Sequence, residues 1–175
     1  MKNQSLEVVK IDSIFLLTLQ AGENRFTDAF IDHIHEALDF VQTAKEAAAL
    51  VTTSSDPKYY SLGLDIKNLK QEPAKVEAYL EKYQRLLSRV VTFSMPTIAA
   101  INGHAAAGGA LFAMAHDVKF VCKEKGFFVM NEIDLGLHLP AGMAAMLKYK
   151  ITNPNLIRDI AICLACVRLA ETVKC

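Results

Sequence analysis

The sequence has little of several residues on which specialised sites and scaffolds depend. Its 175 residues contain no tryptophan, five prolines and four cysteines, three of the cysteines within the last thirteen residues. Cys163 and Cys166 have the CxxC spacing of some metal and redox sites, but no second pair and no histidine partner follows them. We interpret them as small apolar residues on one helix, in a reducing compartment, and expect no metal site.

The chain also lacks an excess charge of either sign. Lysine plus arginine and aspartate plus glutamate each number 19, so no bulk field attracts nucleic acid or an acidic membrane. No apolar run reaches the roughly 20 residues of a membrane span. The first residues lead almost directly into an apolar alternation, without a signal peptide or an arginine-rich transit segment. We therefore expect neither a nucleic-acid nor a membrane partner, and no readable targeting signal.

Several catalytic and cofactor motifs are missing. Gly103 and Gly108 are spaced as in a phosphate loop, but no Lys-Ser or Lys-Thr follows. The dinucleotide fingerprint GxGxxG and the hydrolase motif GxSxG are absent. The histidines form no HExxH or other tight ligand set. The sequence therefore predicts neither a nucleotide cofactor nor a metal, and weakens a serine hydrolase interpretation.

The composition that remains is that of one globular α/β domain. Hydrophobic residues make up 52% and charged residues 22% of the chain. Apolar segments with strand and helix periodicity alternate, which favours mainly parallel pairing. Strands are predicted at 6–11, 14–19, 47–53, 97–101, 118–122 and 127–130, a loop at 54–60, and helices at 28–43, 74–91, 107–115, 142–148 and 154–169.

Three turns stand where a parallel sheet would bind a ligand, outside the carboxyl ends of strands. Ile98–Leu111 runs from an apolar strand through Gly108 and Gly109 into small residues that can open a helix. The second turn holds Gly63, and a carboxylate, Glu132, follows in the third. Exposed N–H groups at a helix start hold negative charge, so two such turns and one carboxylate predict chemistry on an anionic intermediate.

These turns resemble those of the crotonase superfamily, also called the enoyl-CoA hydratase/isomerase family. The match runs from about Leu6 to Tyr149 and is strongest over Ile98–Asp117, with Tyr60–Lys67 resembling the first oxyanion loop. The resemblance implies a spiral of ββα units in a single domain over 1–175. It also implies that 150–175 is the start of a C-terminal helical region, most of which is lacking.

For the ligand, the resemblance implies an acyl-CoA thioester whose coenzyme A is part of the substrate, with no separate cofactor. It also implies an oxyanion hole made of the backbone N–H groups of Leu64 and Gly108. Donors aimed at such an oxygen stabilise the enolate that forms there. The same correspondence places contacts to substrate and CoA at Arg25, Ser61, Gly63, Asp65, Lys67 and Gly109.

The carboxylates discriminate between reactions. Hydratases of the family use two glutamates, and one of these positions holds Leu111 here, whereas the other matches Glu132. A lone glutamate can move one proton from C2 to C4 of the same substrate, which resembles the Δ3,Δ2-enoyl-CoA isomerases of fatty acid β-oxidation, especially plant-type peroxisomal members. Glu132 is therefore the predicted catalytic residue, and Asp134, two residues on, is its competitor.

Two alternatives stay open at this point. The chain could be a non-catalytic crotonase-like subunit that binds acyl-CoA, or an enzyme of other enolate chemistry, hydration included, with Asp134 or His138 recruited. Family resemblance implies a peroxisomal or mitochondrial protein, and a homotrimer where the C-terminal region is supplied.

Overall fold

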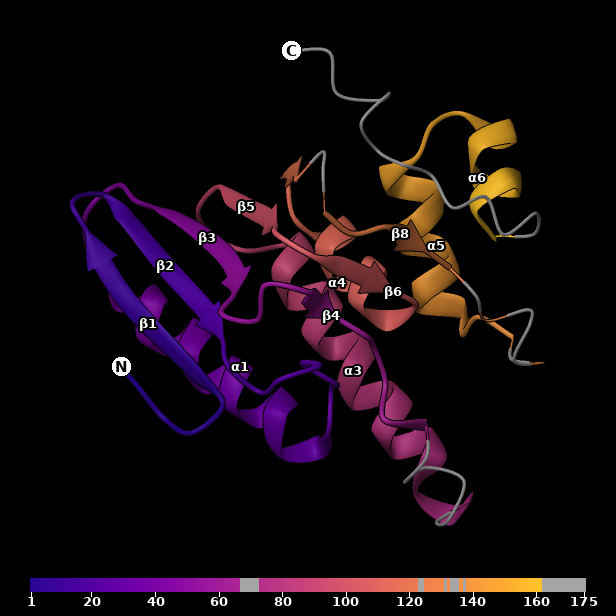
Figure 1. Cartoon of the computed structure of the whole chain (residues 1–175), viewed down its shortest axis with the longest axis horizontal. Helices are drawn as coiled ribbons and strands as arrows, with labels where there is room; N and C mark the ends of the chain where they lie inside the picture. The colour runs from indigo at the N-terminus through magenta and orange to yellow at the C-terminus, as the bar shows by residue number, and fades with distance from the viewer. Residues whose placement is uncertain (67–72, 123–124, 131, 133–135, 137, 162–175) are drawn as a thin grey trace.

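The computed structural model describes residues 1–66, 73–122, 125–130, 132, 136 and 138–161, and these form two β-sheets with helices packed beside them (Figure 1). The larger sheet has the strand order β1-β2-β3-β5-β7. The strands are β1 (Leu6–Ile11), β2 (Ile14–Leu19), β3 (Ala49–Ser54), β5 (Thr97–Ile101) and β7 (Val118–Val121). The predicted α/β class with mainly parallel pairing is confirmed, because only β1 and β2 pair antiparallel in this sheet.

The first two predicted strands form a hairpin. Leu6 pairs with Leu19 and Ile11 with Ile14, so the chain reverses over Asp12-Ser13. Asp12 has a φ of +51°, a left-handed conformation that Asp tolerates better than most residues in such turns. Along β2 the buried residues alternate with more exposed ones, which is why one face of the hairpin joins the core.

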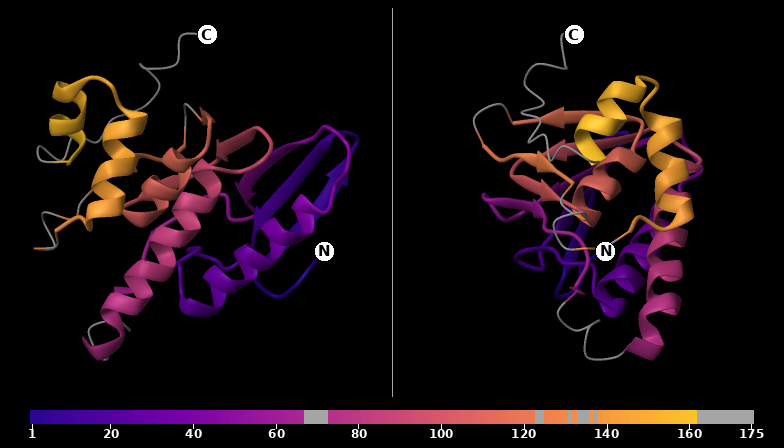
Figure 2. Two further views of the ribbon diagram at one scale, coloured as in Figure 1. Left: turned by 180° about the vertical axis from the view of Figure 1, so that it is seen from behind. Right: turned by 90° about the vertical axis from the view of Figure 1, so that its right-hand side faces the viewer.

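The helices pack together on one side of the strands, where α1 and α3 lie next to each other (Figure 2). α1 (Asp28–Gln42) begins where Thr27, its N-cap, accepts a hydrogen bond from the Phe30 N–H at 3.2 Å. A 3₁₀ turn (Pro73–Lys75) leads into α3 (Val76–Val91), and α5 (Ala141–Lys150) and α6 (Pro154–Ala161) follow later. Of the predicted helix at 154–169, positions 162–169 lie outside the described residues.

A second, three-stranded sheet has the order β4-β6-β8 and is parallel throughout. Its strands are β4 (Tyr59–Ser61), β6 (His104–Ala106) and β8 (Phe128–Val129). The predicted loop at 54–60 is wrong for Tyr59 and Tyr60, which lie in β4, and the sequence predicts no strand at β6. Both strands are three residues long, too short for an alternating pattern to stand out.

The helix that follows β6 is buried on all sides. All eight residues of α4 (Gly108–Ala115) are buried, as its uniformly apolar sequence predicts. Leu111 keeps 1% of its surface exposed. Buried apolar side chains from Leu6 to Ile160 form one cluster around this helix, so α4 occupies the centre of the core. None of the helices described is both long and apolar enough to cross a membrane.

A buried polar network ties α4 to the strands at its C-terminal end. The fully buried ring of His116 lies 3.0 Å from the Thr52 hydroxyl through Nε2 and 2.9 Å from the Phe112 carbonyl oxygen through Nδ1. The Thr52 hydroxyl in turn lies 2.7 Å from that of Tyr60. A neutral ring that donates through Nδ1 satisfies all of these groups.

This network predicts a loss of stability in weak acid. The pKa of His116 is lowered to about 4, and burial is the largest cause. Lys119 and Lys150 also lower this pKa, whereas the Phe112 carbonyl and Asp117 raise it. The unfolded chain binds the proton near pH 6.5 and the folded chain does not, so stability falls as pH drops from 6.5 towards 4. We expect a loss of about 3 kcal/mol over this window. Urea unfolding at several pH values checks it, and His116→Gln, which cannot titrate, should show a correspondingly flatter dependence.

Candidate functional site

The three predicted turns meet at one edge of the small sheet. Leu64 follows the end of β4, Gly108 the end of β6, and Glu132 the end of β8. Because the three strands are parallel and adjacent, their carboxyl ends lie at the same edge. The topology therefore brings together residues that are far apart in the sequence.

The first two turns touch through their glycines. Gly63 has a φ of +79°, and a Cβ added to it would lie 2.6 Å from the Gly108 nitrogen and 2.8 Å from the Ala106 oxygen. A Cβ added to Gly108 would lie 3.2 Å from the Leu64 nitrogen. Only glycines permit this approach, which sets the Leu64 and Gly108 amides beside each other.

These two amides are available to a ligand. Within the part of the chain that the structure describes, neither the Leu64 N–H nor the Gly108 N–H donates a hydrogen bond to another residue. Gly108 is also the first residue of α4, where the helix dipole adds positive potential. Buried N–H groups are rarely left unpaired, so this pair is suited to bind an anionic oxygen.

The backbone before α4 is strained. Ala107 has φ +47° and ψ −121°, a conformation that residues with a Cβ seldom adopt. Its own N–H donates to the Val129 oxygen at 2.8 Å, which anchors the turn to β8. This hydrogen bond fixes the backbone next to the Gly108 N–H. It also connects that backbone to β8, the strand that leads to Glu132.

The first turn is supported from inside by Ser61 and Asn24. The fully buried Ser61 hydroxyl donates to the Asn24 carbonyl oxygen at 2.7 Å and accepts the Gly63 N–H at 3.1 Å. Asn24 is also fully buried, and its side chain bonds to Ser54 and to the Tyr60 carbonyl. Gly109 packs so closely on the Ser61 carbonyl that a Cβ there would collide with it. The predicted contact residues Ser61 and Gly109 thus hold the two turns against each other.

Glu132 follows β8 and is partly buried. Burial raises its pKa above the ordinary value of 4.5. Its charge contributes to raising the pKa of Tyr83, whose hydroxyl donates to the Gly108 carbonyl oxygen. A carboxylate with raised proton affinity therefore interacts electrostatically with the tyrosine that contacts the Gly108 carbonyl.

Two of the remaining predicted contact residues line a cavity of about 400 Å³ beside the first turn. Arg25 and Asp65 line it. The Arg25 guanidinium lies 2.6 Å from Glu23 and 3.5 Å from the Leu62 carbonyl oxygen. Lys67 and Asp134 lie outside the described residues, and His138 is exposed.

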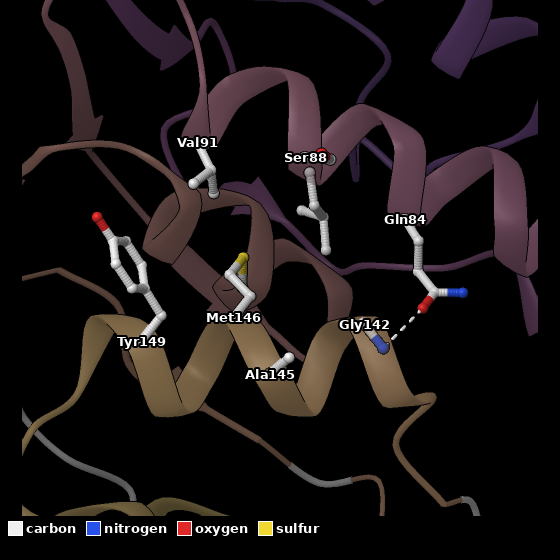
Figure 3. A pocket seen from close by; sticks show the side chains of 8 residues that line it. Gln84, Ser88, Val91, Gly142, Ala145, Met146 and Tyr149 are labelled. Atoms are coloured by element: carbon white, nitrogen blue, oxygen red, sulfur yellow. Dashed lines mark hydrogen bonds between the residues drawn. The ribbon is translucent and has the colours of Figure 1, made fainter.

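A second cavity, of about 320 Å³, lies between α3 and α5 and contains none of the predicted site residues (Figure 3). Gln84 of α3 accepts the Gly142 N–H across its rim at 3.1 Å. Its other lining residues are Leu87, Ser88, Val91, Ala145, Met146 and Tyr149. Over the described residues no group of three or more histidine, cysteine, aspartate or glutamate side chains could hold a metal ion.

The structure adds residues that the sequence analysis did not single out. Tyr79 and Tyr83 of α3 contact the two turns directly, although the charged residues of that helix indicate only its solvent-facing side. Asn24 gives no sequence signal beyond a loop position, yet its φ is +48° and it is fully buried. The burial of these three residues could be known only from the fold.

The sequence profile described as enoyl-CoA hydratase/isomerase matches residues 10–170. The chain belongs to this family. The peroxisomal enoyl-CoA delta isomerase 1 of Arabidopsis thaliana is 31% identical over 167 residues, which are 94% of this chain and 70% of that protein. The mitochondrial enoyl-CoA hydratase of Pongo abelii is 32% identical over 119 residues, 68% of this chain and 40% of that protein. The predicted family is thus confirmed, and the relatives' names favour the isomerase interpretation.

Solved structures support the fold. DspI of Pseudomonas aeruginosa superposes with a TM-score of 0.82 at 22% identity, over 92% of this chain and 66% of its own. A probable enoyl-CoA hydratase of Mycobacterium tuberculosis gives a TM-score of 0.84 at 20% identity, over 91% and 66%. The predicted crotonase-like fold is confirmed, and the chain spans about two thirds of the length of these proteins.

Proposed function

We propose that this chain is a Δ3,Δ2-enoyl-CoA isomerase, which shifts the double bond of a 3-enoyl-CoA to the trans-2 position. The thioester oxygen accepts hydrogen bonds from the N–H groups of Leu64 and Gly108. Glu132 removes a proton from C2, and the electron pair delocalises over C1 to C4 as a dienolate. Glu132 then returns the proton to C4, so that the C3–C4 double bond becomes a C2–C3 double bond.

The observation that carries this proposal is the combination of two amides that donate to no other described residue with the Glu132 carboxylate, whose pKa is raised. The amides suit the negative charge that develops on the thioester oxygen. The raised proton affinity suits a group that must take a proton and release it again. Addition of water needs a second acid or base, and the position that holds one in hydratases is Leu111, buried in α4 with 1% exposed.

Coenzyme A would enter as part of the substrate. We assign the binding of its phosphates to Arg25 and Lys67, because cationic side chains form charge-assisted hydrogen bonds with phosphate oxygens. Gly63 and Gly109 permit the close approach of backbone, and Asp65 lines the cavity beside the hole. The reaction needs no other cofactor, because the thioester itself supplies the electron sink.

Incubation with a 3-enoyl-CoA and, separately, with a trans-2-enoyl-CoA tests the proposal. We expect conversion of the first to the trans-2 product and no hydration of the second. Formation of a 3-hydroxyacyl-CoA from the second would contradict the isomerase and favour a hydratase. Binding of acyl-CoA without any turnover would favour the non-catalytic subunit instead.

The cellular setting follows the same proposal. The Arabidopsis relatives are named as peroxisomal and the Pongo abelii relative as mitochondrial. We place this chain in one of these two organelles, where fatty acid β-oxidation supplies its substrate, and as a homotrimer when a C-terminal helical region is present. Fluorescence microscopy of the tagged protein, and its mass in solution, check the two statements.

A further inference from the structure

Helix α3 presents two tyrosines to the site from one face. Tyr79 and Tyr83 are four residues apart, one turn of the helix, and keep 5% and 0% of their surfaces exposed. Both hydroxyls reach backbone groups of the two turns that meet at the sheet edge. A single rigid element therefore contacts both halves of the hole.

Tyr79 holds the first half. Its hydroxyl accepts the Asp65 N–H at 3.1 Å and donates to the Phe26 carbonyl oxygen. Asp65 directly follows Leu64, and Phe26 forms an isolated bridge with Leu64 while its N–H donates to the Gly63 oxygen at 2.9 Å. The backbone on both sides of the Leu64 amide is thus tied to α3.

Tyr83 holds the second half. Its hydroxyl donates to the carbonyl oxygen of Gly108, the residue whose N–H forms the other side of the hole. Its ring lies 5.0 Å from that of Phe26, so it also packs against the first turn. Burial raises the pKa of Tyr79 to about 12 and that of Tyr83 well above its ordinary value. Both side chains stay protonated and remain donors at neutral pH.

We infer that Tyr79 and Tyr83 are positioning residues that set the spacing of the Leu64 and Gly108 amides through α3. The inference rests on the proposed function, because that spacing matters only if both amides bind one oxygen. Such donors act on charge that develops in the transition state, so their misplacement lowers kcat more than it weakens substrate binding. A shift of about 1 Å can cost about a hundredfold in rate.

Tyrosine-to-phenylalanine variants separate this role from a merely structural one. We expect Tyr79→Phe and Tyr83→Phe to lower kcat by about ten- to a hundredfold, with the Kd of a saturated acyl-CoA within about twofold of wild type. Thr97→Val is the matched control, since Thr97 of β5 is fully buried and its hydroxyl donates to the Asp117 carboxylate beyond the C-terminal end of α4, away from the two turns. It should lower the Tm to a similar extent and leave kcat within about twofold.

Two further measurements decide between explanations. The Leu64 and Gly108 amide resonances in ¹H–¹⁵N spectra should move in both α3 variants and stay in place in Thr97→Val. The acid limb of the pH–rate profile should stay unshifted in Tyr83→Phe, because the lost hydroxyl is neutral. A shifted limb would mean that Tyr83 acts on Glu132, and would overturn the positioning role for that residue.

The outcomes keep the two claims apart. If wild-type protein does not isomerise 3-enoyl-CoA, the proposed function fails, and the amide spectra alone decide whether the tyrosines set the geometry. If wild type is active and both variants keep its kcat, or if the two amide resonances do not move, the positioning role is overturned while the isomerase stands.

Discussion

Glu132→Gln is expected to lower kcat for isomerisation about ten-thousandfold while acyl-CoA still binds. General acid–base catalysis contributes about 10²–10⁴ in rate, and here one carboxylate acts in both proton transfers, so the loss falls at the upper end. Glutamine keeps the size and shape of the side chain but cannot accept the C2 proton. Steady-state rates with 3-enoyl-CoA and the Kd of a saturated acyl-CoA check the two parts of this expectation.

The same variant should be slightly more stable than wild type. The pKa of Glu132 is raised in the folded protein, so the folded state binds the proton more tightly than the unfolded chain. This contribution to stability is present at low pH and is lost as pH rises through the raised pKa. At neutral pH the buried carboxylate therefore destabilises the fold, and glutamine removes that cost. A higher Tm together with lost turnover excludes unfolding as the cause.

The pH dependence of the wild type follows from the same shift. The base must be ionised, so kcat/KM should fall with decreasing pH along a limb that lies above the ordinary 4.5 of glutamate. Asp134→Asn serves as the control and should keep activity within about tenfold. Wild-type-like turnover by Glu132→Gln, or loss confined to Asp134→Asn, would move the catalytic role to Asp134.

Some parts of this site were predictable because they leave strong local signals. The glycines at 108 and 109, followed by a run of small and apolar residues, predict a buried helix start, and α4 lies there. Gly63 indicates a turn that a ligand can approach closely; its φ of +79° shows the turn conformation, and the approach of the ligand stays a prediction. These signals are local in the chain and need no knowledge of distant contacts.

Other parts depend on contacts that no local pattern encodes. β4 and β6 have three residues each and are stabilised by pairing with each other, so their periodicity is too short to detect. The charges along α3 indicate a solvent-facing side but say nothing of which backbone groups Tyr79 and Tyr83 meet on the other. Roles for Lys67 and Asp134 remain predictions, since both lie outside the described residues.

Gly63→Ala is expected to lower kcat about a thousandfold by separating the two halves of the hole. The new Cβ would stand 2.6 Å from the Gly108 nitrogen and 2.8 Å from the Ala106 oxygen, so one backbone segment must move. Loss of one oxyanion donor costs about 10²–10³ in rate, and here both donors change their relative position. A saturated acyl-CoA forms no dienolate, so the two N–H groups of the hole contribute little to its binding free energy. Its Kd should therefore change far less than kcat.

The substitution also imposes backbone strain, which a control must isolate. Gly63 has a φ of +79°, a region that costs an L-residue about 1–3 kcal/mol. Gly22 has a φ of +63° and no heavy atom within 4 Å of an added Cβ. Gly22→Ala therefore introduces comparable strain without the collision, and should lower the Tm while leaving kcat within about twofold.

The comparison of the two variants identifies what the glycine at 63 provides. If only conformational freedom were needed, Gly63→Ala and Gly22→Ala would lose similar amounts of stability, and neither variant would lose turnover. If the contact between the two turns creates the hole, turnover collapses in Gly63→Ala alone, and the Leu64 and Gly108 amide resonances move with it. Wild-type kcat in a folded Gly63→Ala protein would mean that these two amides do not stabilise the intermediate, and the oxyanion hole would have to lie elsewhere.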